Sequence, residues 1–220
     1  MKEKIISEFL GTYFLVFAGT GAVVIDQMTK SLTHVGVSIT FGLVVMALIY
    51  TFGHISGAHF NPAVTIGFLI DKAITKREAM YYIVTQIIAG IAASATVLSL
   101  FGNVASLGAT LPSGAWYQSF VLEFILSFFL MFVILGSAIH GKSAKSFAGI
   151  AIGATVGLEA MFGGPISGAS MNPARSIGPA IVSGNLQHLW VYIVATILGA
   201  ICAAMIYKIL DDKKRSVQRV

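Results

Sequence analysis

Six long apolar stretches restrict most strongly what this chain can fold into. Most of them approach the roughly 20 residues that a helix needs to cross the ~30 Å hydrocarbon core of a bilayer. Backbone polar groups in that core need partners within the protein, so a spanning segment of this kind is a helix. The stretches that we expect to span the membrane are Ile5–Ile25, Val35–Phe52, Ala79–Phe101, Trp116–Ile139, Phe147–Phe162 and Leu189–Tyr207.

Composition and charge agree with a membrane protein. The chain is 56% hydrophobic and 10% charged, whereas soluble domains carry about 25% charged residues. If the N-terminus is cytoplasmic, Lys30 and Arg175 are the exceptions among 14 lysines and arginines that otherwise lie on the cytoplasmic side. This positive-inside bias predicts a multi-pass protein of the plasma or inner membrane with both termini cytoplasmic. It accounts for the net charge of +5 without a nucleic-acid partner.

The chain repeats itself weakly, once in each half. "SEFLGTYFLVF" resembles "LEFILSFFLMF" and aligns Glu8 with Glu123. Each half reads as two spans, a short apolar segment and a third span, so three crossings invert the second half relative to the first. We expect one domain over residues 1–220, composed of inverted repeats 1–107 and 108–220. Such repeats place the functional site at their interface, near the bilayer midplane.

An uncommon phrase also occurs once in each half, as "GHISGAHFNPAV" and "GPISGASMNPAR". Asparagine is a strong N-cap and proline suits the first helical position, so each copy predicts a helix start. The segments that follow, Asn61–Ile70 and Asn172–Val182, are too short to cross alone. Paired short segments of this kind predict re-entrant half-helices that line a cavity. The motif residues are Asn61, Pro62, Ala63, Asn172, Pro173 and Ala174.

The motif chemistry favours a path for neutral molecules. A half-helix N-terminus carries about half a positive elementary charge, and two such ends facing one lumen oppose cations. The asparagine amides supply N–H donors to a passing oxygen. Arg175 follows in the first turn of the second half-helix, and an arginine in a membrane segment usually faces a water-filled path. The competing interpretations are two ordinary capped helices and an arginine that reaches the lipid headgroups.

The paired "HFNPAVT" and "SMNPARS", the aligned glutamates and the six spans resemble the aquaporin, or major intrinsic protein, family over essentially the whole chain. Within it, the longer stretches "GLVVMALIYTFGHISGAHFNPAVTI" and "GATVGLEAMFGGPISGASMNPARSIGPA" are most similar to nodulin-like intrinsic proteins of plants and their bacterial relatives. The resemblance implies an all-α integral membrane fold with six transmembrane helices and two re-entrant half-helices. It also implies a homotetramer in the lipid bilayer, one pore per subunit, and no enzymatic activity.

The family's selectivity filter has four positions, which the resemblance assigns by their spacing from the two asparagines. Water-selective members carry a histidine at the second position and glycerol facilitators keep two aromatic residues, whereas this sequence has alanine there and one aromatic residue. The resemblance therefore implies a wide ring with one apolar wall and one strong donor. The four residues are Phe41, Ala160, Ala169 and Arg175.

Other polar residues of the spans have two interpretations each. Glu8 and Glu123 suit a proton-coupled carrier, but the resemblance implies that they accept hydrogen bonds from the backbone of the re-entrant loops. His54 and His59 suit pore gating, or packing and hydrogen bonding near the cytoplasmic vestibule, which we favour. No further metal ligands stand out nearby. With a lone cysteine in the chain, neither a metal site nor a cofactor is expected.

Glu159 breaks the repeat, because the residue aligned with it in the first half is Leu48. Three positions are open for its side chain: the lumen, a neighbouring subunit and the outer vestibule. A one-residue bend in the fifth span would also put Glu159 or Met161 into the filter in place of Ala160.

We expect a passive channel for water and small uncharged polar solutes that excludes protons and ions. Glycerol and the metalloid acids (boric, arsenous and silicic acid) fit the wide ring. A water-selective aquaporin is the alternative. A secondary transporter with broken helices is a more distant one, because no second acidic cluster accompanies the motifs to bind a coupling ion.

Overall fold

The computed structural model describes residues 1–139 and 145–217; Lys142 and Arg219, assigned above to the cytoplasmic side, lie outside them. The α-helices of the described chain are α1 (Lys2–Thr29), α2 (Thr33–Ser56), α3 (Pro62–Ile70), α4 (Lys76–Phe101), α5 (Trp116–Ile134), α6 (Ala148–Ser167), α7 (Pro173–Ser183) and α8 (Leu189–Val217). Short helical turns form at Ala105–Gly108, Leu135–Ile139 and Lys145–Phe147.

Within the described ranges, six helices are long and apolar enough to cross a membrane, and each contains or closely follows one predicted stretch. The helices are longer than the apolar stretches because regular backbone hydrogen bonding continues into polar residues at the ends. Directly after α5, the turn Leu135–Ile139 is π-helical and continues the span to its predicted end at Ile139.

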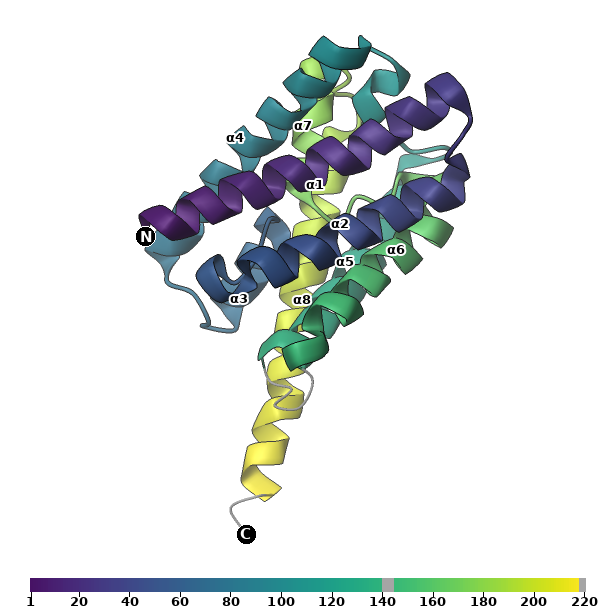
Figure 1. Cartoon of the computed structure of the whole chain (residues 1–220). Helices are drawn as coiled ribbons and strands as arrows, with labels where there is room; N and C mark the ends of the chain where they lie inside the picture. Colours follow the sequence, from purple (N-terminus) through teal and green to yellow (C-terminus); the bar gives the residue numbers. More distant parts are fainter. Residues whose placement is uncertain (140–144, 218–220) are drawn as a thin grey trace.

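The two short helices α3 and α7 interlock the halves of the chain. The helix α1 packs against α2 and α4, and α5 packs in the same way against α6 and α8. Each short helix contacts the last span of the other half, since α3 lies against α8 and α7 lies against α4 (Figure 1). Neither half therefore encloses its own half-helix alone.

The helices α2 and α6 join the halves through glycines that let their backbones meet. A Cβ atom added at Gly42 would lie 2.7 Å from the carbonyl oxygen of Gly153, and one added at Gly153 would lie 2.7 Å from that of Gly42. Gly157, one turn further along α6, faces the same Gly42. Small residues at helix crossings are how membrane helices gain close van der Waals contact.

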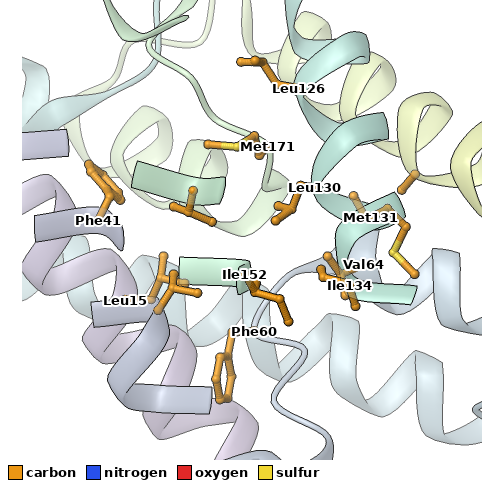
Figure 2. Close-up of a cluster of buried hydrophobic side chains, with 14 of the residues drawn as sticks. Leu15, Phe41, Phe60, Val64, Leu126, Leu130, Met131, Ile134, Ile152 and Met171 are labelled. Atoms are coloured by element: carbon orange, nitrogen blue, oxygen red, sulfur yellow. The ribbon is translucent and has the colours of Figure 1, made fainter. Parts of the chain in front are cut away.

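Apolar side chains from several helices converge on the centre of the bundle (Figure 2). Leu15 of α1, Phe41 of α2, Leu130 of α5 and Ile152 of α6 are all buried there. The same side chains line a cavity, so this cluster is the wall of an internal space and not a solid core.

Replacing Gly153 by alanine tests the α2–α6 contact. Gly153→Ala lowers stability by about 1–3 kcal/mol, because the added methyl group overpacks a backbone contact. Gly21→Ala in α1 is the matched control, since nothing lies within 4 Å of its added Cβ. The thermal unfolding midpoint in detergent checks this, and equal midpoints for the two variants would contradict it.

Candidate functional site

The short helices α3 and α7 begin with the same cap. The side-chain oxygen of Asn61 accepts hydrogen bonds from the backbone N–H of Ala63 (2.8 Å) and Val64 (3.4 Å). The oxygen of Asn172 accepts from Ala174 (3.0 Å) and Arg175 (3.4 Å). Both asparagines have extended backbones and are followed by proline at the first helical position. The cap uses the amide oxygen, so the amide nitrogen of each side chain points elsewhere.

These amide nitrogens tie the two motifs together across the bundle. Asn61 Nδ2 donates to the carbonyl oxygen of Met171 at 2.7 Å, and Asn172 Nδ2 donates to that of Phe60 at 2.9 Å. Each motif thus bonds to the residue that precedes the other motif. An amide nitrogen carries two hydrogens, so each asparagine keeps a second N–H, and both side chains line the internal cavity.

Glu8 holds the loop that leads into α3. Its carboxylate accepts hydrogen bonds from the backbone N–H groups of His59 (2.9 Å) and Phe60 (2.7 Å). Ser56 Oγ donates to it at 2.7 Å and Gln86 Nε2 at 2.8 Å. Glu8 is completely buried, so these four donors replace the water that the carboxylate loses.

Glu123 holds the loop that leads into α7 in the same way. Its carboxylate accepts hydrogen bonds from the backbone N–H groups of Ser170 (2.8 Å) and Met171 (2.9 Å) and from Ser167 Oγ (2.7 Å). Like Glu8, it is completely buried. In both halves a spanning helix therefore supplies the acceptor for two backbone N–H groups of the loop.

Both loops contain residues in the left-handed region, where side chains are disfavoured. Ala58 and Phe60 have φ of 52° and 50°, and Ala169 and Met171 have φ of 42° and 55°. Glycines with φ of 86° and 85° begin the two loops directly after α2 and α6. Each such non-glycine residue costs about 1–3 kcal/mol, and the carboxylate bonds offset that strain.

Two cavities share part of their lining. The large cavity, about 630 Å³, contains both asparagines in its wall. The small cavity, about 250 Å³, is lined by residues from the C-terminal ends of α1 and α6 and from the N-terminal part of α2. Residues of the linker 102–115, which joins α4 to α5, also line it. Phe41, Ala169 and Arg175 line both cavities, and Ala160 lines the small one. The structure thus brings the four residues assigned to a filter together, where the two cavities adjoin.

Arg175 is fixed at this junction by the linker. Its Nη1 donates to the carbonyl oxygen of Gly108 at 2.7 Å, and its guanidinium carbon lies 5.0 Å from the centroid of the Phe41 ring. It is 3% exposed, and its buried Nε has no partner within the described chain. A backbone carbonyl holds the guanidinium in place without neutralising its charge.

The two histidines singled out in the sequence, His54 and His59, lie at the large cavity. Nδ1 of His59 is 3.1 Å from Thr65 Oγ1, and its ring packs 4.3 Å from the Phe68 ring and 5.0 Å from the Tyr82 ring. His54 is exposed and lines the same cavity. Across the described residues, no group of three histidine, cysteine or acidic side chains is placed to hold a metal ion.

Glu159 lies at none of the three positions left open for it. Its side chain is 0% exposed and lines neither cavity, so it lies inside the subunit. Met161 is 39% exposed, and its carbonyl oxygen lies 2.7 Å from Nε2 of His34. The α6 backbone turns Ala160, and neither neighbour, to the small cavity.

Two residues that position the site were not predicted from the sequence. Gln86 of α4 bonds to Glu8 and donates to Thr65 Oγ1 at 3.0 Å; a lone amide in an apolar span was the available signal. Gly108 of the linker holds Arg175 through its carbonyl oxygen. A backbone carbonyl is present at every residue, so no sequence signal distinguishes that acceptor.

The comparisons with known proteins agree with this geometry. A family model described as "Major intrinsic protein" matches residues 1–207. The chain belongs to the major intrinsic protein family. Nodulin-26 of Glycine max is 47% identical over 210 residues, which cover 94% of this chain and 78% of that protein. Aquaporin NIP1-2 of Arabidopsis thaliana is 47% identical over an alignment of 227 residues, and the alignment covers 99% of this chain and 77% of that protein.

A solved structure shares the fold of this major intrinsic protein. The aquaglyceroporin from Plasmodium falciparum matches it with a TM-score of 0.82 and 25% identity, over 93% of this chain and 94% of that one. The family resemblance and the fold class expected from the sequence are confirmed. The chain is a multi-pass membrane channel for water and small solutes and not an enzyme, as its family membership establishes.

Glu123→Gln tests how far the carboxylate supports the second loop. An amide has one acceptor oxygen, so the backbone N–H of Ser170 or Met171 loses its partner, and stability falls by about 1–3 kcal/mol. Water permeability falls with it, because the loop carries Ala169 and Asn172. The exposed carboxylate of Glu3 provides the control, Glu3→Gln. Thermal unfolding in detergent and water flux in proteoliposomes check this; a variant as stable as the control would contradict it.

Proposed function

We propose that this channel conducts water together with small uncharged polar solutes, and that the ring of Phe41, Ala160, Ala169 and Arg175 selects them. The observation that carries the proposal is the shared lining of the two cavities by ring residues, with two alanines between the aromatic residue and the arginine. A molecule that passes between the cavities passes these side chains. Alanine at two of the four positions adds little side-chain bulk to the ring.

The chemistry of the ring favours neutral, oxygen-bearing solutes. Arg175 donates hydrogen bonds and repels cations, and the Phe41 ring provides an apolar wall. The N-termini of α3 and α7 add partial positive charge at the two asparagines. Glycerol, boric acid, arsenous acid and silicic acid have the size and the hydroxyl groups that suit such a ring. The relatives named as aquaporins and the solved structure named as an aquaglyceroporin support water and glycerol within this range.

The assembly and location of the channel are part of the proposal. We propose a homotetramer in the plasma or inner membrane, with one pore per subunit and both termini cytoplasmic. The lysines and arginines at the N-terminal ends of α1 and α4 support this orientation. We further propose that residues 1–107 and 108–220 form the two inverted repeats of a single channel domain. The similar caps and carboxylate bonds of the two loops support it.

Permeability measurements test the proposed function directly. Stopped-flow light scattering on proteoliposomes compares water, glycerol and boric acid fluxes in one preparation. Solute fluxes well above those of empty liposomes are the expected result. Fast water flux with solute fluxes at the empty-liposome level would overturn the solute part and leave a water-selective channel. Flux that saturates and follows an ion gradient would favour a transporter instead.

Ala160→His tests the width of the ring. The imidazole fills the space beside Ala169, so glycerol permeability falls by about tenfold while water permeability falls less than threefold, as expected for a steric barrier of ~1.4 kcal/mol. Ala160→Gly is the matched control, because it changes the same position without adding bulk, and it keeps the native ratio of glycerol to water flux. Equal losses of both fluxes in Ala160→His would contradict the assignment of Ala160 to the filter.

A further inference from the structure

Glu159 carries a buried carboxyl group for which the channel described so far has no use. The residue lies in α6 and is 0% exposed, and neither carboxyl oxygen has a hydrogen-bond partner within the described residues. Buried polar groups in folded proteins are almost always hydrogen-bonded, so an exception indicates an absent partner or a function. The other buried carboxylates, Glu8 and Glu123, are fully engaged by their loops.

The position of Glu159 relates it to the filter. It directly precedes Ala160, which lines the small cavity. One turn further along the same face of α6 is Gly163, where an added Cβ would lie 3.0 Å from the side chain of Leu126 in α5 and 3.7 Å from the Cβ of Ala169. The face of α6 that carries the Glu159 carboxyl group therefore packs against α5 and against the loop that contains the ring residue Ala169.

A second observation points to the same place. In the part of the chain that the structure describes, the charged side chains with buried, unpartnered atoms are Glu159, through both carboxyl oxygens, and Arg175, through Nε. Arg175 belongs to the ring, and Glu159 directly precedes the ring residue Ala160 in α6. One is a donor and the other an acceptor, and a hydroxylated solute offers the complement of both.

We propose that Glu159 is a further specificity-determining residue of the channel. Its carboxyl group lines neither cavity in the described structure. When a solute occupies the ring, the carboxyl group rotates past the methyl group of Ala160 and accepts a hydrogen bond from one hydroxyl group of the solute, while another oxygen of that solute accepts from Arg175. The favoured ligands are neutral molecules with two or more hydroxyl groups, such as small polyols. Glu159 thereby supplies the second polar wall that alanine at position 160 leaves out. The inference rests on the proposed solute conduction.

Two substitutions of Glu159 separate hydrogen bonding from packing. Glu159→Leu gives α6 the residue that α2 has at the aligned position, Leu48, and removes the polar group. Glu159→Gln keeps an acceptor oxygen at the same size. We expect Glu159→Leu to lower the ratio of glycerol to water permeability by about fivefold, the scale of one lost hydrogen bond. Glu159→Gln stays within about twofold of the native ratio by the same reasoning.

Other results in proteoliposomes would overturn the inference. If Glu159→Leu keeps the native ratio, the carboxyl group takes no part in selection. If both variants lose water and glycerol flux in proportion, Glu159 supports the fold and does not contact the solute. Monodisperse elution and unchanged water flux identify variants that are correctly folded, and Glu159→Gln, the isosteric variant, provides the comparison if Glu159→Leu does not assemble.

An infrared measurement tests the same contact without flux. The carboxyl band of Glu159 is the band missing from Glu159→Gln, and we expect it to shift when glycerol is added to the native channel. A shift without glycerol flux would mean that the proposed solute conduction fails while the solute still reaches Glu159. Glycerol flux with an unmoved band and an unchanged permeability ratio would mean that the proposed function stands and the role of Glu159 is wrong.

Discussion

The rest of this structure depends on the hydrogen bonds that two buried carboxylates accept from two loops. A loop at membrane depth exposes N–H groups that lipid cannot satisfy. Glu8 takes the N–H groups of His59 and Phe60, and Glu123 takes those of Ser170 and Met171. Burying a carboxylate is costly unless donors surround it, so each glutamate requires its loop as much as the loop requires it. This mutual dependence makes a break in the helical backbone tolerable inside a bilayer.

Once the loops are fixed, the positions of the asparagines follow. Residues with left-handed backbone conformations turn the backbone within each loop. The asparagine cap at the end of the loop then begins α3 or α7. The bonds from Asn61 to the Met171 carbonyl and from Asn172 to the Phe60 carbonyl lock the two loops to each other. Two positive helix ends and two N–H donors are thereby held in the wall of one cavity. The packing of each half-helix against the other half resists any relaxation of this strained arrangement.

The fold and the centre of the site were predictable because local rules determine them. The length and hydropathy of the spans, the caps at Asn61 and Asn172 and the unusual arginine at position 175 each have a physical reading that needs no neighbours. What could not be predicted depends on tertiary contacts. The carbonyl oxygen of Gly108 holds Arg175 only because the linker folds back over α7. The burial of Glu159 inside the subunit likewise depends on the rotation of α6 about its axis. The sequence of α6 does not reveal that rotation, because apolar residues occur on nearly all sides of the helix.

The two halves of the chain share their framework and differ where we propose that selection occurs. The caps, the buried glutamates and the left-handed loop residues occur in both halves. In contrast, the residue three positions after the asparagine is Val64 in one motif and Arg175 in the other, and Leu48 aligns with Glu159. Each glutamate holds the loop of its own half, and each asparagine bonds across to the other loop, so changing any of them weakens the fold. Arg175 and Glu159, which have no counterpart in the first half, are not the residues that hold the loops. Under the proposed function they determine which neutral solutes pass.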